Sequence, residues 1–162
     1  MSDTTISIRP LDISEIGLVE PLWNALREHH TALAPTLDSP RPREESWARR
    51  RAQYENWLAE PGSFILVAEQ ASALVGYAMV HLRSASPTWS SSEQAGEIET
   101  LSVLPNVRGQ GIGTALLQGV RERLEPLALG ELSLHVLAGN DDATRFYERH
   151  GFSPFATWMR AG

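Results

Sequence analysis

Residues 101–117 read LSVLPNVRGQGIGTALL, where a strand-like apolar run passes through a proline into three closely spaced glycines and then into a helical pattern. Gly109, Gly111 and Gly113 let the backbone curve tightly and bring free N–H groups toward one point. The helix that follows adds the positive end of its dipole, and Arg108 adds a charge at the rim. This stretch therefore predicts a binding site for an anion, above all a pyrophosphate.

The spacing of these glycines argues against two common nucleotide loops. No Lys-Ser/Thr pair ends the run, as it would in a nucleoside-triphosphate loop. Residues 108–113 read RGQGIG, which departs from the dinucleotide fingerprint, and a chain of 162 residues is short for a doubly wound fold. Taken alone, the glycines are equally compatible with a tight turn that binds nothing.

Strand-like and helical patterns alternate along the rest of the chain. Period-two patterns predict strands at 4–9, 63–69, 74–82, 96–103, 132–137 and 152–160. Helical spacing predicts helices at 13–30, divided at Pro21, and at 44–58, 111–124 and 140–150. The order predicts an α/β fold with one mixed, twisted sheet of about six to seven strands, helices on both faces and two early helices after the first strand. The strands at either end of helix 111–124 should be parallel.

The composition is that of one ordinary globular domain, so residues 1–162 are expected to form a single domain. A net charge of −6 disfavours nucleic acid and anionic lipid as partners and suits a cationic small molecule or peptide. The absence of cysteine excludes a thiol nucleophile and a zinc-thiolate site. No leader-like or membrane-spanning segment is found, so a cytoplasmic protein is expected.

Two motifs in this order resemble those of the GNAT N-acetyltransferase family. Residues 108–113 resemble its pyrophosphate motif, R/Q-x-x-G-x-G/A, and a V-x-P segment precedes them at 103–105. Residues 140–152, NDDATRFYERHGF, resemble its later motif, N-x-x-A-x-x-F-Y-E-x-x-G-F. The resemblance covers essentially the whole chain. It departs at the carboxyl end, where the usual final strand pair is shortened and the acceptor pocket would close differently.

The resemblance implies that acetyl-CoA is the cosubstrate, with no metal, and that an amine attacks it directly without a covalent enzyme intermediate. The backbone of Leu101, Ser102 and Val103 would pair with the pantetheine arm, with the Leu101 N–H near the acetyl oxygen. The pyrophosphate would be held by Arg108, Gly109, Gln110, Gly111, Ile112, Gly113 and Thr114.

Two residues of the later motif have roles in the family. Tyr147 matches the position whose hydroxyl acts as general acid toward the leaving thiolate; the alternative is a tyrosine that only packs on its helix. Asn140 matches a residue that contacts the pantetheine, although a helix cap would explain an asparagine there equally well.

The catalytic base is open among Glu97, Glu99, His135 and water. Period two predicts that residues 97, 99, 101 and 103 project alike, so both carboxylates should share a face with the acetyl-binding residues. Glu97 matches by count the base of histone-type members, whereas Glu99 is closer to the acetyl carbon, and a water-relayed route is expected. The alternative is two solvated carboxylates. His135 lies where some relatives place a base or an acceptor-positioning group.

The two early helices line the acceptor site in this family, which suggests Trp23 and His30 as acceptor contacts together with His135. Most aromatic residues of these helices are expected in the core, and one or two would form a wall for a cationic amine; the set is Trp23, Trp47, Tyr54 and Trp57. The arginines at 49–51 are interpreted as a solvated helix face paired with Glu44, Glu45 and Glu55.

The sequence therefore favours an acetyl-CoA-dependent N-acyltransferase acting on a primary amine of a small molecule, an amino acid or a peptide amino terminus. The alternative is a non-catalytic module that binds or senses acyl-CoA, since the glycine loop alone would serve both. A homodimer is expected only because members of the resembled family commonly form one.

Overall fold

A computed structural model describes residues 5–34, 39–89 and 92–161. In these ranges the strands are β1 (Ile6–Pro10), β2 (Phe64–Gln70), β3 (Ala73–Ser84), β4 (Gln94–Val103) and β5 (Leu132–Leu134). The α-helices are α1 (Glu20–Leu33), α2 (Arg43–Leu58), α3 (Ile112–Leu124) and α4 (Asp141–Arg149), and the short 3-10 helices are η1 (Ile13–Val19), η2 (Pro105–Val107) and η3 (Glu125–Leu127). Thr4, the first residue of the predicted strand at 4–9, lies outside the described residues.

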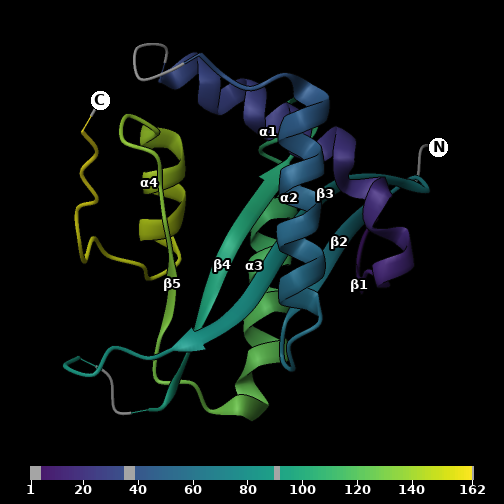
Figure 1. Ribbon diagram of the computed structural model, residues 1–162. Coiled ribbons are helices and arrows are strands. Elements are labelled where there is room, and N and C mark those ends of the chain that lie inside the picture. The colour runs from purple at the N-terminus through teal and green to yellow at the C-terminus, as the bar shows by residue number, and fades with distance from the viewer. Residues whose placement is uncertain (1–4, 35–38, 90–91, 162) are drawn as a thin grey trace.

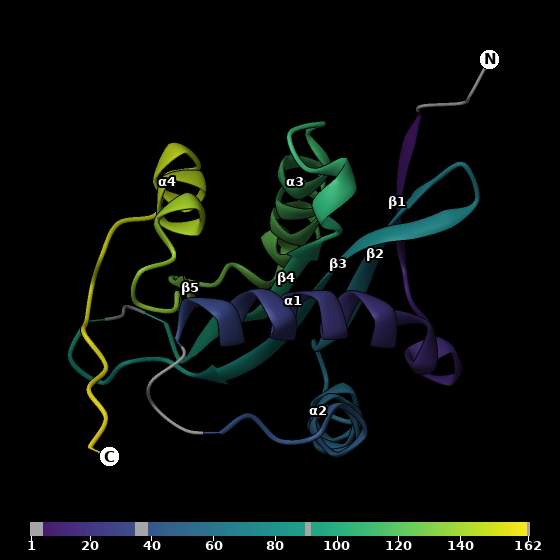
Figure 2. The same cartoon turned by 90° about the horizontal axis from the view of Figure 1, so that it is seen from above.

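The strands form one sheet in the order β1-β2-β3-β4-β5. Neighbours are antiparallel except β4 and β5, which are parallel and joined through α3. Helices α1 and α2 lie on one face of the sheet, and α3 and α4 lie on the other, as Figure 2 shows. The predicted mixed α/β architecture is confirmed.

Each face of the sheet carries its own hydrophobic core. The predicted stripe of α3, formed by Ile112, Leu116, Val120 and Leu124, is buried against β2, β3 and β4. On the opposite face, η1, α1 and α2 bury a second cluster that includes Trp47 and Tyr54, as expected for most of the early aromatics. The sheet is therefore covered on both sides, which leaves its edges and the ends of β4 and β5 for function.

Local sequence explains most of the element boundaries. Asp12 caps η1, its side chain accepting a hydrogen bond from the Ser14 N–H, and Pro21 lies in the first turn of α1, where its missing N–H costs nothing. The predicted division at this proline is confirmed. Between β2 and β3 the chain reverses through Ala71 and Ser72, which have φ of 50° and 63°, as a two-residue hairpin turn requires.

A β-bulge in β4 changes which side chains share a face. Met79 on β3 lies opposite Thr100, but Val80 lies opposite Ile98, so Glu99 is an extra residue on β4. An extra residue reverses the alternation of side chains beyond it. Leu101 and Val103 consequently pack with the α3 core, on the face opposite to Glu97 and Glu99. The prediction that residues 97, 99, 101 and 103 project alike is wrong for the last two.

The pairing of β4 with β5 is short. It covers only Gly96–Ile98 against Leu132–Leu134, although a strand was predicted as far as residue 137. Beyond these paired residues, β4 and the segment that follows β5 diverge (Figure 1). Among the described residues, 99–103 of β4 therefore have a strand partner only on the β3 side. The resulting fork offers a free strand edge.

The predicted strand at 152–160 does not form, so the sheet has five strands in the described part of the chain rather than six to seven. This segment runs outside the sheet (Figures 1 and 2) and exposes Phe155, Trp158 and Met159. Alternating residues make a strand only where a sheet edge pairs with them, and Pro154 removes one ladder donor. Separately, none of the described helices is long and apolar enough to cross a membrane.

The core on α3 gives a direct stability test. Leu116→Ala removes a side chain that is 0% exposed, so the free energy of unfolding should fall by about 3 kcal/mol. Leu18→Ala is the matched control, since Leu18 is 51% exposed and its truncation should cost under about 0.5 kcal/mol. Denaturant unfolding measures both variants. Equal losses would contradict the assignment of the α3 stripe to the core.

Candidate active site

In the loop before α3, a positive φ at two positions requires glycine. Gly109 and Gly111 have φ of +78° and +81°, which side chains rarely adopt, and a Cβ at either position would meet nothing within 4 Å. Gly113 is different, since its Cβ would lie 3.3 Å from Cζ of Phe146 on α4. The first two glycines therefore shape the loop, and the third lets α4 approach α3.

This loop presents a row of free backbone donors. Among the described residues, the N–H groups of 109–114 donate to no protein acceptor, and the first recorded bond of the helix runs from the Ala115 N–H to the Gly111 carbonyl at 2.9 Å. The row lies at the positive end of the α3 dipole, where an anion is stabilised. Arg108 stands beside it, exposed, with its Nε donating to the Val103 carbonyl at 3.2 Å. The predicted anion site thus has the donors that it needs.

A contact that the sequence did not reveal joins this loop to α4. Oγ1 of Thr114 lies 3.1 Å from Nε2 of His150, and Nδ1 of His150 lies 2.7 Å from the Phe146 carbonyl. Because a carbonyl only accepts, Nδ1 carries the proton and Nε2 accepts from the threonine hydroxyl. The first turn of α3 and the last turn of α4 are therefore fixed to each other.

Tyr147 lies on α4 with its ring between two phenylalanines. The ring centroids of Phe146 and Phe152 are 5.2 and 5.6 Å away. Its hydroxyl has no hydrogen-bond partner among the described residues. Burial raises the pKa of Tyr147 to about 12, so the hydroxyl stays protonated near neutral pH and is able to donate a proton.

Asn140 is the cap of α4. It is buried, and its side-chain oxygen accepts a hydrogen bond from the Ala143 N–H at 3.3 Å. The capping alternative is therefore confirmed, and the pantetheine contact stays a prediction.

The two carboxylates of β4 lie together on the α2 face and are not simply solvated. Oε1 of Glu99 lies 2.7 Å from Nη1 of Arg50, and its Oε2 lies 3.3 Å from Nε2 of His81 on β3. Oε2 of Glu97 lies 3.1 Å from Nε of Arg83, and its Oε1 lies 3.1 Å from Nδ1 of His135. Each carboxylate therefore contacts one guanidinium and one imidazole.

Three of these side chains have a spacing that a metal ion would accept. His81, Glu97 and Glu99 place one ligand atom each within 4.8 Å of one another. However, Arg50 and Arg83 already compensate the two carboxylates, so a cation would have to displace both guanidinium groups. The arrangement fits an ion-pair network better than a metal centre.

Arg50 corrects the interpretation of the arginine run. Arg49 and Arg51 pair with Glu45 and Glu55 at 3.0 and 2.8 Å on the exposed face of α2, as predicted. Arg50 instead points toward the sheet, because successive helical residues are turned by about 100°. Its side chain is only 21% exposed.

The aromatic residues proposed as an amine-binding wall are largely occupied. The guanidinium carbon of Arg50 lies 4.6 Å from the ring centroid of Trp23, so it covers one face of that ring. Trp57 stacks on His81 with centroids 4.3 Å apart and an interplanar angle of 1°. A cation–π wall would therefore require Arg50 to move.

His30 lies in the last turn of α1, and no recorded contact joins it to the Glu97 and Glu99 network. Burial, with His29 nearby, lowers the pKa of His30, so it is neutral near neutral pH. The structure thus brings His135, Glu97 and Glu99 together and leaves Trp23 and His30 outside that group.

Sequence reasoning missed His81 and Arg83 as members of the site, whereas Trp57 was among the aromatic residues considered for the acceptor wall. A signal for both was present: His81 and Arg83 continue the period-two row of Tyr77 and Met79 on β3, so they had to share a face with that core.

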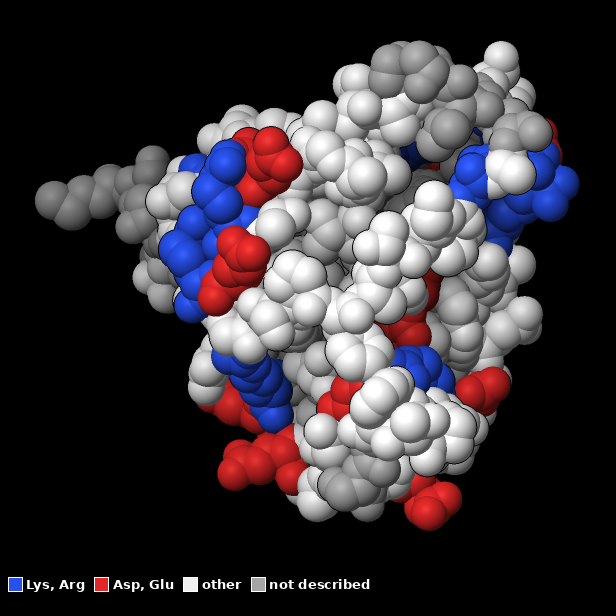
Figure 3. Space-filling model, turned by 90° about the vertical axis from the view of Figure 1, so that its left-hand side faces the viewer, with Lys and Arg blue, Asp and Glu red and all other residues white. Residues whose placement is uncertain are grey.

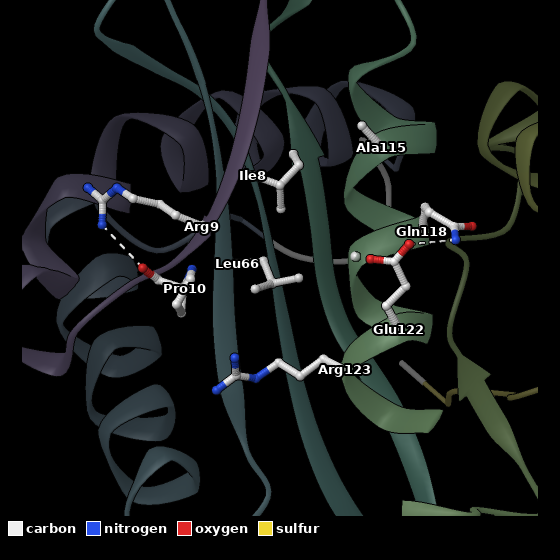
Figure 4. A pocket seen from close by; sticks show the side chains of 9 residues that line it. Ile8, Arg9, Pro10, Leu66, Ala115, Gln118, Glu122 and Arg123 are labelled. Atoms are coloured by element: carbon white, nitrogen blue, oxygen red, sulfur yellow. Dashed lines mark hydrogen bonds between the residues drawn. The ribbon is translucent and has the colours of Figure 1, made fainter. Parts of the chain in front are cut away.

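A separate groove lies away from these residues. An open groove of about 540 Å³ runs between α3 and strands β1 and β2, lined by residues such as Ile8, Leu66 and Glu122 (Figure 4). No predicted site residue lines it. On the side that carries α4 and the carboxyl-terminal segment, uncharged atoms fill most of the surface, and red acidic atoms are visible in a recess (Figure 3).

The Arg50 contacts lead to a second prediction. Arg50→Ala leaves Glu99 without its guanidinium partner, so the free energy of unfolding should fall by about 2 kcal/mol. Arg49→Ala removes an exposed pair on the same helix and should cost under about 0.5 kcal/mol. Urea denaturation compares the two variants, and an equal effect would show that Arg50 is only another solvated arginine.

Comparison with known proteins agrees with this geometry. The profile described as the Acetyltransferase (GNAT) family matches residues 23–152. Mycothiol acetyltransferase of Thermobispora bispora is 32% identical over 144 residues, covering 86% of this chain and 44% of that protein. The protein of the same name in Geodermatophilus obscurus is 32% identical over 153 residues, covering 90% of this chain and 46% of that protein. The chain thus spans less than half the length of these two relatives.

Solved structures share the fold. A GCN5-related N-acetyltransferase from Ralstonia eutropha superposes with a TM-score of 0.74 at 22% identity, covering 97% of this chain and 98% of that one. An aminoglycoside N-acetyltransferase in complex with CoA superposes with a TM-score of 0.73 at 16% identity, covering 98% of this chain and 94% of that one. With the matched profile spanning most of its length, the chain belongs to the acetyltransferase (GNAT) family.

Proposed function

We propose that this chain is an acetyl-CoA-dependent N-acetyltransferase that moves the acetyl group to a primary amine by direct attack. The observation that carries the proposal is the row of free N–H groups at 109–114, placed at the positive end of α3. The names of its relatives support a small-molecule acceptor, since they refer to mycothiol and to aminoglycosides. A peptide amino terminus is a further acceptor of the same chemistry.

The proposed path of acetyl-CoA follows the fork between β4 and β5. The free edge at 99–103 offers backbone groups of Leu101, Ser102 and Val103 to the amides of the pantetheine arm, as an added strand would use them. The Leu101 N–H would lie near the acetyl oxygen and stabilise the oxyanion. The pyrophosphate would then reach the loop, held by the N–H groups of Gly109, Gln110, Gly111, Ile112, Gly113 and Thr114 and by the Arg108 side chain.

The bulge at Glu99 suits this path. It sends Leu101 and Val103 to the α3 face while keeping both carboxylates on the α2 face, beside His81 and His135. The acetyl donor and the proton-accepting groups would therefore approach the fork from different sides. Of the residues predicted to contact the acceptor amine, His135 is better placed than Trp23, because His135 lies exposed at the fork whereas Arg50 covers one face of the Trp23 ring.

In this proposal Tyr147 protonates the leaving sulfur. The pKa of about 12 keeps its hydroxyl neutral, and no described residue competes for that hydroxyl. A neutral phenol can supply a proton to a thiolate as the C–S bond breaks.

Turnover separates this proposal from a module that only binds acyl-CoA. The protein is incubated with acetyl-CoA and a panel of neamine, glucosamine, tyramine and a tripeptide with a free amino terminus. We expect CoA thiol release with at least one amine and an acetylated product by mass spectrometry. Acetyl-CoA binding without thiol release from the whole panel would favour the binding module.

Tyr147→Phe tests the acid directly. The substitution keeps the ring and removes the hydroxyl, so kcat should fall about 100-fold while the Kd for acetyl-CoA changes by less than about twofold. Steady-state kinetics and calorimetry measure the two quantities. An unchanged kcat would remove Tyr147 from the mechanism, and a parallel loss of binding would assign it a packing role.

A further inference from the structure

The contacts of Glu97 and Glu99 bear on which group accepts the proton of the amine. All four carboxylate oxygens have a nitrogen partner between 2.7 and 3.3 Å: Arg50 and His81 for Glu99, and Arg83 and His135 for Glu97. The side chains of Glu97 and Glu99 are only 11% and 23% exposed, and each is held between a guanidinium and an imidazole. An acceptor amine therefore reaches these carboxylates less readily than it reaches an exposed group beside them.

His135 is the imidazole that an acceptor can reach. It follows β5 directly, at the point where pairing with β4 ends, and its side chain is 80% exposed. Nδ1 faces Oε1 of Glu97, so the proton belongs on Nδ1 and the lone pair on Nε2. Glu97 itself is buried and is held by Arg83, which also bonds Glu131 at 2.6 Å and Ser133 at 2.9 Å.

His81, in contrast to His135, is inaccessible to solvent on most of its surface. Its ring is buried, stacked flat on Trp57, and bonded through Nε2 to Glu99. An imidazole held on one face by an indole and on one edge by a carboxylate is suited to fixing β3, β4 and α2 together. It is poorly placed to meet an acceptor from solvent.

We propose that Nε2 of His135, and neither carboxylate, accepts the proton of the amine, and that Glu97 is the positioning residue that sets its tautomer. This proposal rests on the proposed acetyl transfer. The charged and titratable groups around the pair are Glu97 and Glu99 on β4, His81 and Arg83 on β3, Arg50 on α2, and Glu131 just before β5.

The ammonium gives one proton to Nε2 of His135, and the freed nitrogen lone pair forms the C–N bond at the thioester carbonyl. The C–S bond then breaks, and its electron pair leaves with sulfur, which takes the proton of Tyr147. The second proton of the former amine nitrogen restores the tyrosine through water, and the imidazolium releases its proton to solvent. The net products are the amide, CoA thiol and one proton.

Kinetics with the amine that turns over in the panel test this assignment. His135→Gln should lower kcat/KM about 100-fold at pH 7 and abolish the acid limb of its pH profile, and added imidazole should restore part of the rate. Glu97→Gln should lower kcat/KM about tenfold, because it removes the carboxylate contact that sets the tautomer of His135. A kcat/KM within about threefold of the parent and an unchanged profile for His135→Gln would overturn the proposal.

Glu131→Gln is the matched control for Glu97→Gln. Glu131 and Glu97 both contact Arg83, but only Glu97 contacts His135. If Glu97 served only to hold Arg83, both variants would have the same effect. We expect Glu131→Gln to lower kcat/KM by less than about threefold and to leave the profile in place. Equal effects would reduce Glu97 to a structural partner.

A second measurement does not depend on the acceptor. Nitrogen-15 NMR of the imidazoles should show His135 protonated on Nδ1 in the parent protein and a mixture of tautomers in Glu97→Gln. The same mixture in both proteins would overturn the pairing. If no amine in the panel turns over, the proposed acetyl transfer is contradicted. The NMR result then still shows whether Glu97 sets the tautomer of His135, so the failure of one proposal can be told from the failure of the other.

Discussion

The extra residue at Glu99 is the constraint on which the rest of the site depends. Without it, β4 would alternate regularly, and Leu101 would share the face of Glu97. With it, the carboxylates stay on the α2 face while Leu101 and Val103 join the α3 core. The bulge also lies next to the end of the β4–β5 pairing at Ile98, so the strand edge that the cofactor would use becomes free immediately beyond it. Bulges are frequent beside active sites because they redirect side chains in this way.

The second feature is a compensated charge network in a half-buried setting. Between β3, β4, β5 and α2, each of two neighbouring carboxylates contacts one guanidinium group and one imidazole. Partnering lowers the cost of placing charge away from water, and the distances fix each side chain in one orientation. Rigid placement of this kind is what a proton-transferring group needs before a substrate arrives. The network therefore connects the stability of the sheet to the chemistry proposed at its fork.

The sequence predicted features that depend on local periodicity or on a backbone requirement. The stripe of α3, the cap and length of α4, and the glycines at 109 and 111 are all where the pattern placed them. The errors have one cause, because each depends on contacts between distant segments. A bulge is invisible in a single strand, Arg50 faces inward only because Glu99 and Trp23 lie opposite it, and residues 152–160 lack a sheet edge to pair with.

The central claim is that the loop before α3 binds the pyrophosphate of acetyl-CoA. Calorimetric titration with acetyl-CoA, and with ATP as a control ligand, tests it on the parent protein, Gly111→Ala and Gly151→Ala. Both glycines have positive φ, +81° and +85°, and space for a Cβ, so both variants carry a similar backbone strain. The account predicts selective binding of acetyl-CoA that weakens at least about tenfold in Gly111→Ala, or about 1.4 kcal/mol, and is retained in Gly151→Ala. No binding by the parent, or equal losses in both variants, would contradict it.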